Sequence, residues 1–593
     1  MLDETLLPTL LERAKERRPV EIRAPAPEPR FPFARVASRF GGQLLGRWWR
    51  RLTGRTDPDA EAVRLRELFE ELGGLWIKIG QLASLRTDVF SPETCRELAT
   101  LQHRAVGFPL PLVEKILRQE YGAELDSIFQ YFSDAPIAAA SISQVHLALL
   151  REPNVVVAVK VRRPTAERAF LRDLAHIRQL VAVVDFFGFG THLHLHDALW
   201  ELEQMVQEEL DFRYEAANTK RMRKSLKRHG VYVPRVFQSV SNRHVLVTEF
   251  IDGVLMSDFI RISQKEPKRV ERWCQTNNVD PEKVGKRLFR TVLRQVLEDN
   301  LFHADVHPGN IILLRDSRFV LIDFGTIGFC ERDMLVNYKA SLVAMARKDF
   351  GKAAEVMLRL AIAPPSLGDI KNLRRDLVRT YRDWESRTHL TGTEYYERSL
   401  GAAGAEAGRI MTRYKVTLNW AFMRINRTWS TMDASLNYLI PNANYIELFT
   451  GYFDSAKRRQ MAPRRVLRAA ASTVGRIASQ VDEYNTALEH LVRRQQLYSS
   501  IIGSTSERIV RAITTFLRFV RLMLTLAFAA GLISFVILHH DSLLPKHEPM
   551  FLDRFAHQME GVPYEWWWVI LVVLIVSNFA FKKIVRRLES RPG

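Results

Sequence analysis

The sequence predicts an α+β fold in which a strand-rich segment lies between two helical segments, followed by two apolar helices near the C-terminus. Three observations predict this class: residues 60–86 follow a helical pattern, the β-branched run at residues 155–161 is typical of a strand, and the chain beyond residue 255 is mainly helical in pattern. With 593 residues, of which 47% are hydrophobic, the chain is long enough for several domains with substantial cores.

The composition narrows the class of protein before any motif is considered. A formal net charge of +19 indicates an anionic partner, which could be nucleic acid, nucleotide or a lipid surface. No recognised nucleic-acid-binding motif accompanies the charge, so we expect no nucleic-acid partner. The three cysteines, Cys95, Cys274 and Cys330, lie far apart, which excludes a disulfide framework and a zinc knuckle. The N-terminus lacks the apolar core of a signal peptide, so we expect the bulk of the chain in the cytoplasm.

Residues 1–57 are predicted to be a basic leader and linker. The stretch GQLLGRWWRRLTGR within them fits either an anionic membrane surface or a solvated helix docked on its own protein. Residues 58–125 are predicted to be a helical extension, in which LGGLWIKIGQLASL is apolar on nearly every face and so marks a buried helix. Lys78 and Gln81 share one face of it. A lysine is seldom buried alone, so Lys78 either reaches solvent at the helix edge or pairs with a carboxylate elsewhere.

Residues 126–254 are predicted to hold the main strands. Lys160 is the only charge in the strand VVVAVKV, which is where a lysine that pairs with nucleotide phosphates belongs. Such a lysine is held by a glutamate on a helix. A long polar helix is expected at Glu201–Gly230, and in it Asp211 and Glu215 would lie one turn apart on one face. Position alone leaves four candidate partners open: Glu208, Glu209, Asp211 and Glu215.

The stretch HADVHPGN, followed by Asp-Phe-Gly, carries the chemistry. An H-x-D element, an asparagine five residues after its aspartate and a D-F-G thirteen residues later are the kinase order of parts. Asp305 can accept a proton from an acceptor hydroxyl or orient a water, while Asn310 and Asp323 can hold Mg²⁺ against phosphate oxygens. A strand-like FVLI leads into Asp323. The pattern therefore predicts a phosphoryl-transfer site.

The phosphate loop of a protein kinase is rich in glycine, but the corresponding stretch here reads DAPIAAASISQVH. Glycine allows positive φ and a close approach of the backbone to phosphate oxygens, and alanine denies both. No A-P-E element follows the D-F-G, so the platform that presents a peptide substrate is missing. The sequence thus indicates a nucleotide site that differs from that of a generic protein kinase.

Two uncharged apolar runs near the C-terminus, Leu522–Leu538 and Trp566–Phe581, predict a transmembrane hairpin within residues 505–593. Arginines precede the first run, three tryptophans open the second, and Lys582 and Lys583 begin a basic stretch after it. By the positive-inside bias both ends of the hairpin would face the cytoplasm. The alternative is a buried helical hairpin of a soluble domain.

Taken together, these motifs make the sequence resemble the UbiB family of atypical kinases, also called the AarF or ADCK-type family, over roughly residues 60–450. KIGQ at Lys78–Gln81 is similar to the family's KxGQ motif, AAASISQVH to its alanine-rich loop, and EELDFRYEAAN to its ExD segment. VAVKVRRP, HADVHPGN and DFG complete the resemblance. Ser143 stands where the family more often has alanine, and Val306 where it often has proline.

The resemblance implies a kinase-like bilobal fold in which residues 126–254 form the N-lobe, residues 255–500 form a helical C-lobe, and the KxGQ extension packs over the active site. It implies catalytic roles for Asp305 and Lys78, metal binding by Asn310 and Asp323, and ATP or ADP with Mg²⁺ as cofactors. Lys78 would pair with Glu209 or Asp211, and Lys160 with Glu215. It implies regulatory roles for Gln81, Glu209 and Asp211, and nucleotide binding by Ile137, Ala138, Ala139, Ala140, Ser141, Ile142, Ser143, Gln144, Val145, Lys160, Glu215 and Glu249.

The resemblance implies a membrane-anchored atypical kinase or ATPase that supports ubiquinone biosynthesis or the handling of lipid precursors. The expected location is the cell inner membrane, with the kinase-like domain in the cytoplasm. The expected partners are anionic lipids, isoprenoid quinone precursors and quinone-biosynthesis enzymes. Two alternatives stay open: a non-catalytic, nucleotide-gated module that presents a lipid, and a kinase of small molecules or lipids.

Overall fold

The computed structural model of the protein divides into two compact units, each of which is described by itself. The first consists of Met1–Gln179 and His196–Arg459, and the second of Leu180–Leu195 and Gln460–Gly593. The structure describes residues 9–10, 20–23, 33–52, 57–84, 92–101, 106–140, 142–186, 195–361, 367–390, 395–414, 416, 420–460, 516–532 and 563–589.

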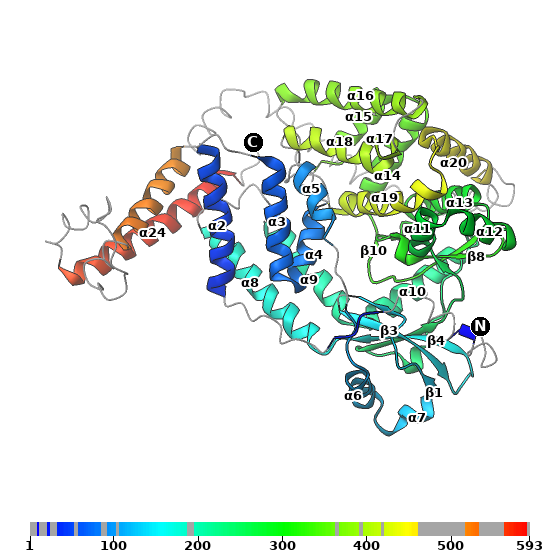
Figure 1. Ribbon diagram of the computed structural model, residues 1–593. Coiled ribbons are helices and arrows are strands. Elements are labelled where there is room, and N and C mark those ends of the chain that lie inside the picture. The colour runs from blue at the N-terminus through cyan, green and yellow to red at the C-terminus, as the bar shows by residue number, and fades with distance from the viewer. Residues whose placement is uncertain are drawn as a thin grey trace, which may run out of the picture. The chain divides into compact units, whose positions relative to one another are not determined.

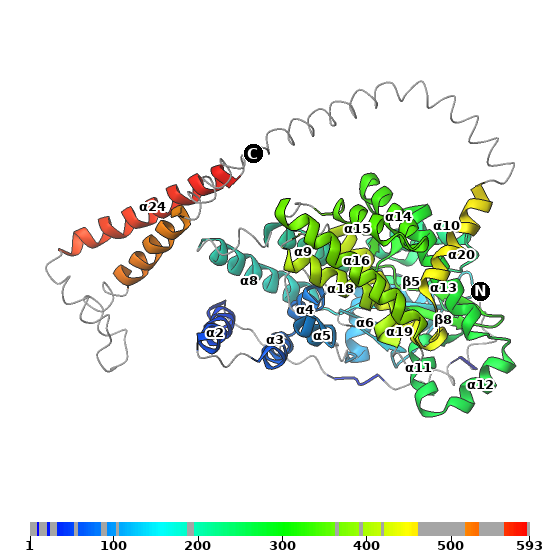
Figure 2. The same cartoon turned by 90° about the horizontal axis from the view of Figure 1, so that it is seen from above.

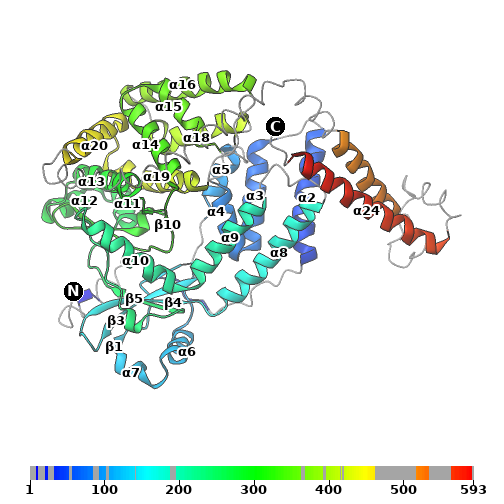
Figure 3. The same cartoon turned by 180° about the vertical axis from the view of Figure 1, so that it is seen from behind.

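The first unit begins with a helical extension, in which the helices between residues 33 and 99 lie side by side in Figures 1 and 3. Asp57 caps the N-terminus of one of them, where its carboxylate accepts from the backbone N–H groups of Asp59 and Ala60. Gly80, within the KIGQ stretch, packs so closely on Leu101 and Phe69 that a Cβ would collide with both. The helices are α2 (Phe33–Leu52), α3 (Pro58–Leu72), α4 (Gly74–Ala83), α5 (Pro92–Ala99) and α6 (Leu110–Tyr121).

A five-stranded antiparallel sheet follows, in which β1, β3, β4 and β5 are adjacent in that order and β2 pairs with β3. Alternate residues of β4 face opposite sides of the sheet. Val157 and Val159 pack on the side of α6, which places Lys160 on the other side. The strands are β1 (Phe129–Phe132), β2 (Ala138–Ala139), β3 (Ser143–Leu150), β4 (Val156–Arg162) and β5 (Val245–Glu249), and the short α7 (Leu125–Ile128) precedes β1.

The single helix expected at Glu201–Gly230 is wrong, because the chain breaks at Asp211. Asp211 has an extended backbone (φ −129°), and its carboxylate caps the next helix by accepting from the N–H of Arg213. Asp211 and Glu215 therefore do not share a helix face as expected. Helices α8 (Ala166–Phe186), α9 (Leu195–Leu210) and α10 (Phe212–Lys227) occupy this part of the chain.

From residue 254 onward the chain is mainly helical, as expected, and it also contains two small antiparallel sheets. One sheet consists of β6 (Val254–Leu255), β8 (Ile311–Leu314) and β9 (Arg318–Leu321). The other consists of β7 (Phe302–His303) and β10 (Ile327–Gly328). At the centre of the helical core, the Phe289 ring lies 5.8 Å from that of Trp429 and 5.5 Å from that of Phe449. Figure 2 shows α14, α15, α16 and α18 packed together. The helices are α11 (Met256–Lys265), α12 (Pro267–Thr276), α13 (Pro281–Arg294), α14 (Arg332–Ala346), α15 (Phe350–Leu358), α16 (Leu367–His389), α17 (Tyr395–Arg398), α18 (Leu400–Arg413), α19 (Trp420–Leu439) and α20 (Tyr445–Gln460).

In the second unit, a helix over residues 516–532 packs against α24 (Tyr564–Glu589). The amide of Asn578 joins them, since it accepts from Arg521 at 3.1 Å and donates to the hydroxyl of Thr525 at 2.6 Å. Among the residues that the structure describes, none of the helices is long and apolar enough to cross a membrane. The end of the first predicted span, residues 533–538, and residues 539–562 of the predicted connecting loop lie outside the described residues.

Candidate active site

A cavity of about 440 Å³ opens between the five-stranded sheet and the small sheet of β6, β8 and β9. The sheet contributes the apolar wall and Lys160, and the segments beside β8 and β9 contribute polar groups. The cavity thus gathers residues from the alanine-rich loop, from the strand of Lys160 and from the segment that holds Asn310 and Asp323. Its lining includes Ile137, Ala138, Ala139, Ala140, Ser143, Val145, Lys160, Glu215, Glu249, Asn310 and Asp323.

Lys160 lies at the centre of the charged groups. Its ammonium donates to both carboxylate oxygens of Glu215, at 3.0 and 2.8 Å, and to Asp323 at 3.3 Å. Burial opposes the charged form of Lys160, but the two carboxylates outweigh burial and raise its pKa. Of the four carboxylates that the sequence left open as its partner, Glu215 is the one in contact.

Glu215 lies in the first turn of α10, whose start is fixed by the Asp211 cap. Its carboxylate is buried, and burial raises its pKa, an effect that the Lys160 ammonium opposes. The bidentate contact with Lys160 satisfies both carboxylate oxygens of Glu215. A buried, doubly bonded pair of this kind fixes the lysine side chain in one orientation.

Asp323 follows β9, where the sequence predicts it, and takes the left-handed φ of 58°. Left-handed backbone is uncommon for a residue with a Cβ and recurs at functional sites. Burial raises its pKa, but the Lys160 ammonium and the N–H of Gly325, 3.2 Å from Oδ1, outweigh burial and lower it. The ionised carboxylate is part-exposed in the cavity, where it can bind a cation.

Asp305 follows β7 and is held on three sides. Its backbone N–H donates to Nδ1 of His303 at 3.2 Å, and its backbone carbonyl accepts from the amide of Asn310 at 3.0 Å. Its carboxylate accepts from the guanidinium of Arg427 at 2.9 Å. Burial raises its pKa, but Arg427 and neighbouring imidazoles outweigh burial and lower it. The carboxylate is therefore ionised, as a proton acceptor must be.

These residues fit a nucleotide with Mg²⁺. The buried hydroxyl of Ser143 lines the cavity and makes no hydrogen bond to any residue that the structure describes, which leaves it available to a ligand. Among the described residues there is no cluster of three His, Cys, Asp or Glu side chains suited to a metal. Mg²⁺ next to phosphates needs only one or two protein oxygen ligands, which Asn310 and Asp323 supply.

Lys78 reaches the same region from the helical extension. Its ammonium, on α4, forms an ion pair with Glu209 on α9. Lys78 and Glu209 line a smaller cavity of about 180 Å³ with Asp305 and Asp323, so the extension contributes to the polar end of the site. Asp211 instead binds the guanidinium of Arg213, 2.6 Å from its Oδ2. Gln81 donates to the carbonyl of Leu101 at 2.8 Å and braces the extension.

The alanine-rich loop is a short hairpin rather than an open flap. Ala138 and Ala139 form β2, opposite Val145 and Gln144 of β3. The side chain of Gln144 lies outside the cavity lining and binds the backbone N–H and carbonyl of Phe108, at 2.7 and 3.1 Å. Gln144 thus braces the hairpin. Ser141 lies outside the described residues.

Two further candidate residues have distinct surroundings. Ile142 packs in the core of α8 and α9 and also lines the smaller cavity. Glu249, at the end of β5, lines the nucleotide cavity, but its Oε2 already accepts from the hydroxyl of Tyr232 at 2.6 Å and the N–H of Arg235 at 3.1 Å. It is therefore held as a rigid part of the wall.

Sequence reasoning missed Arg427. It lies in α19, 122 residues beyond Asp305 in the chain, and no motif surrounds it. Next to it, the Thr428 hydroxyl donates to the carbonyl of His303 at 3.3 Å. The signal in the sequence is weak: two arginines, Arg424 and Arg427, lie three positions apart in an expected helix, and exposed arginines of this kind seldom contribute much.

Part of the chain is similar to known kinase-like proteins. Residues 100–357 match the family model described as the ABC1 atypical kinase-like domain. The chain is 30% identical over 319 residues to a probable protein kinase UbiB of Tolumonas auensis, covering 53% of this chain and 56% of the relative. It is 32% identical over 308 residues to a probable protein kinase UbiB of Marinobacter nauticus, covering 51% of this chain and 54% of the relative. The chain thus spans about half the length of the curated relatives it matches.

Among solved structures, the complex of Rv3197 with erythromycin from Mycobacterium tuberculosis is 22% identical to this chain with a TM-score of 0.38. The alignment covers 68% of this chain and 99% of that one.

Proposed function

We propose that residues 100–357, which match the ABC1 atypical kinase-like domain, form a kinase-like domain of the UbiB type, and that the whole chain is a membrane-anchored atypical kinase or ATPase that acts on Mg-ATP. The single observation that carries the proposal is the contact of Lys160 with both Glu215 and Asp323 in a cavity that also holds Asn310. Kinase-like domains bind ATP generally, and this arrangement is the one that positions nucleotide phosphates.

Each residue has a role that follows from its place. Lys160, held by Glu215, directs a fixed positive charge at the phosphates. Asp323 and Asn310 present oxygen atoms to Mg²⁺, which when bound neutralises charge on the phosphate oxygens. Asp305 accepts the proton of the attacking hydroxyl or water, because its carboxylate is ionised and held in one orientation by Arg427.

The identity of the acceptor is part of the proposal. α14 begins at Arg332, nine residues after Asp323. The part of the chain where a protein kinase builds its peptide platform is therefore already helix. In addition, the pair of Lys78 and Glu209 lies at the polar end of the site, near Asp305. Both observations favour water or a small hydroxyl compound as acceptor over a protein.

We extend the proposal to the location and the pathway. The two helices of the second unit expose several large apolar side chains, among them Phe519, Leu526, Trp568 and Val573, which supports attachment to a membrane. The proposed location is the cell inner membrane with the kinase-like domain in the cytoplasm. The proposed role is support of ubiquinone biosynthesis, with anionic lipids, isoprenoid precursors and quinone-biosynthesis enzymes as partners.

The test is phosphate release from Mg-ATP by the detergent-purified full chain, with and without anionic vesicles. We expect turnover in the wild type, its loss in Asp305→Asn, and an altered rate in Lys78→Ala. Product analysis with candidate lipids and small alcohols separates hydrolysis from phosphorylation of an acceptor. Nucleotide binding without turnover under every lipid condition would rule out the catalytic role.

A second function, a nucleotide-gated module that presents a lipid without chemistry, is favoured by one observation. The carboxylate of Asp305 forms a mostly buried ion pair with Arg427 at 2.9 Å, which offsets the charge of the proposed proton acceptor. This function predicts that Asp305→Asn binds nucleotide and retains biological activity. Complementation of a strain that lacks the protein distinguishes the two functions.

A further inference from the structure

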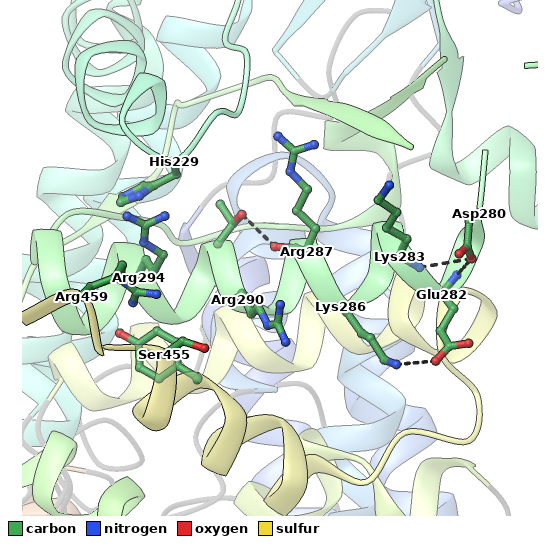
Figure 4. Close-up of a pocket in the computed structure, with 12 residues that line it drawn as sticks. His229, Asp280, Glu282, Lys283, Lys286, Arg287, Arg290, Arg294, Ser455 and Arg459 are labelled. Carbon is green, nitrogen blue, oxygen red and sulfur yellow. Dashed lines mark hydrogen bonds and ion pairs between the residues drawn. The ribbon is translucent and has the colours of Figure 1, made fainter. Parts of the chain in front are cut away.

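A second cavity in the first unit, a groove of about 630 Å³, lies along α13 and is larger than the nucleotide cavity of about 440 Å³. Figure 4 shows its lining side chains along one face of α13, with Ser455 and Arg459 contributed by α20. Neither Lys160 nor Asp305, Asn310 or Asp323 lines it. Six of its lining residues are basic: Lys283, Lys286, Arg287, Arg290, Arg294 and Arg459.

The sequence of α13 explains why these cations share one face. In PEKVGKRLFRTVLR, Val284, Leu288, Phe289 and Val292 are fully buried against the core. Basic residues recur three or four positions apart on the opposite side, which is the helical repeat. The row from Lys283 to Arg294 spans about 16 Å of helix, at a rise of about 1.5 Å per residue. The groove is thus lined by an aligned row of donors.

Acidic side chains balance only part of this charge. At the N-terminal end of α13, Glu282 pairs with Lys286 at 2.5 Å, and the carboxylate of Asp280 caps the helix. At the other end a single carboxylate, Glu298, binds both Arg294 at 3.4 Å and Arg459 at 2.6 Å.

Between these two ends lies Arg290, which is exposed. No ion pair to Arg290 or to Lys283 occurs within the described part of the chain. Arg287 is oriented by its donation to the carbonyl of Gly230 at 2.5 Å. The middle of the groove therefore has an excess of positive charge with donors already in place.

Another surface cavity, of about 540 Å³ between α6 and α8, provides a contrast. There Arg162 pairs with Glu167 at 2.6 Å, and His244 lies 2.5 Å from Glu120. Its lining holds three lysine or arginine side chains, Lys115, Arg162 and Arg168, against two glutamates, so its excess of positive charge is small. The groove along α13 has a larger excess, because six lysine and arginine side chains line it with only Asp280 and Glu282.

We propose that the groove along α13 binds a ligand that carries clustered phosphate groups, at a site separate from the nucleotide cavity. Guanidinium groups bind phosphate oxygens through two parallel hydrogen bonds, and several of them aligned on one helix match several phosphates better than one. The concave shape admits a compact phosphorylated group. Such a group could come from a soluble compound or from the headgroup of a lipid.

The test compares binding by the full chain of two soluble probes, inositol hexakisphosphate and a polyglutamate peptide, measured by titration calorimetry without Mg²⁺. A third arm measures flotation with phosphatidylcholine vesicles, with and without phosphatidylinositol bisphosphate. The groove variant is Lys283→Ala/Arg290→Ala, because neither residue has an ion pair among the described residues to lose. The control is Lys115→Ala/Lys371→Ala, which removes the same charge elsewhere in the first unit. ADP affinity checks the fold of each variant.

We expect the groove variant to lose at least about tenfold in affinity for inositol hexakisphosphate, because two charged donors are removed, while the control keeps its affinity. A loss seen only with phosphoinositide vesicles supports the same site with a lipid as the source. Equal losses in groove and control variants would show that the overall charge of the chain attracts the probe. Equal losses of this kind would overturn the proposal. It would also be overturned if polyglutamate bound as tightly as the phosphate probe, or if no probe bound at all.

Discussion

The guanidinium of Arg427 donates to a carboxylate oxygen of Asp305 at 2.9 Å, and thereby joins α19 to the loop after β7 across 122 residues of sequence. Both side chains are mostly buried, with 14% of Arg427 and 25% of Asp305 exposed. The pair keeps Asp305 ionised and restricts its rotation. Arg427 is thus a positioning residue for the proposed proton acceptor.

Replacement of Arg427 by alanine should lower turnover by up to about a hundredfold, because a misplaced catalytic group costs about that much. Loss of the guanidinium should raise the pKa of Asp305 toward its usual value. Since Asp305 acts in its ionised form, the acid side of the pH–rate profile should then move to higher pH. Arg427→Lys should restore part of both effects, and Arg409→Ala, an exposed arginine on α18, is the control. Faster turnover in Arg427→Ala would show that Arg427 restrains Asp305 instead.

The effects of substituting Lys160 and Glu215 on the free energy of unfolding should be strongly coupled, because the two side chains form a buried ion pair. Lys160→Met leaves the buried carboxylate of Glu215 without its partner, and an unpaired buried charge costs about 3–5 kcal/mol. Lys160→Met/Glu215→Gln removes both charges and should be more stable than Lys160→Met alone. Urea unfolding of the two single variants and the double variant measures the coupling. Additive losses of stability would show that the two side chains act independently. In a separate measurement, ADP binding should be weak in every variant that lacks Lys160.

Much of the site could be predicted from the sequence, because kinase-type chemistry fixes residue types at fixed local spacings. Asp305, Asn310 and Asp323 lie beside β7, β8 and β9, where the spacing places them, and Lys160 faces the cavity from the valine-rich strand β4. The break of the polar helix at Asp211 was not predicted. The polar pattern of the sequence continues through it, whereas the structure shows the boundary in the extended backbone of Asp211 and in its capping hydrogen bond to the N–H of Arg213.

What could not be predicted depends on contacts between distant segments. Arg427 has no local signal, because its partner lies 122 residues away in the sequence. The stretch AAASISQVH looks like a single loop motif in the sequence. In the structure some of its residues line the cavity, and others hold the loop against the rest of the protein. Ser143 lines the cavity, whereas Gln144, the next residue, points to Phe108. Successive residues of β3 face opposite sides of the sheet, which is why these two neighbours point in different directions. The composition of the loop does not predict where β2, a strand of two residues, begins or ends.

The hairpin of the alanine-rich loop should set the preference between ATP and ADP. Ala139 is paired with Gln144 in a regular antiparallel ladder, which holds the loop backbone in an extended form. Ala139→Gly frees the backbone at that position and lets the loop approach the terminal phosphate. We expect the ratio of ATP to ADP affinity to change, with Ala158→Gly as the control in the cavity wall. An unchanged ratio by calorimetry would refute the account of the loop.

Ser143 should contribute to ligand binding and little to stability. Its hydroxyl is buried at the cavity and has no hydrogen-bond partner among the described residues. Ser143→Ala removes a group that costs free energy to bury, so the apparent melting temperature should stay equal or rise. Nucleotide affinity should fall about fivefold to tenfold, because one hydrogen bond to a ligand contributes on the order of 1 kcal/mol. Equal affinity in both proteins would mean that the hydroxyl does not face the ligand.

His146 is a buried histidine that the fold holds in its neutral form. Its Nδ1 lies 2.8 Å from the carbonyl of Ser133 and its Nε2 lies 2.9 Å from the amide nitrogen of Gln144. A neutral ring protonated at Nδ1 donates to the carbonyl and accepts from the amide, so a second proton has no acceptor. Burial lowers the pKa of His146 from 6.5 to about 4, although the Ser133 carbonyl opposes this.

Stability should therefore fall as the pH drops through this window. Between pH 6.5 and about 4 the unfolded chain binds a proton at His146 that the folded chain does not, so acid favours unfolding. The full stabilisation is present above pH 6.5, and up to about 3 kcal/mol is lost by pH 4, because one pKa unit corresponds to about 1.4 kcal/mol. Urea unfolding across the window should show a shallower decline in His146→Gln, whose side chain does not titrate. His303, also buried with a lowered pKa, accounts for part of the remaining slope, and the exposed His389→Gln should behave as the wild type. The same slope in His146→Gln and the wild type would show that His146 is not a source of acid sensitivity.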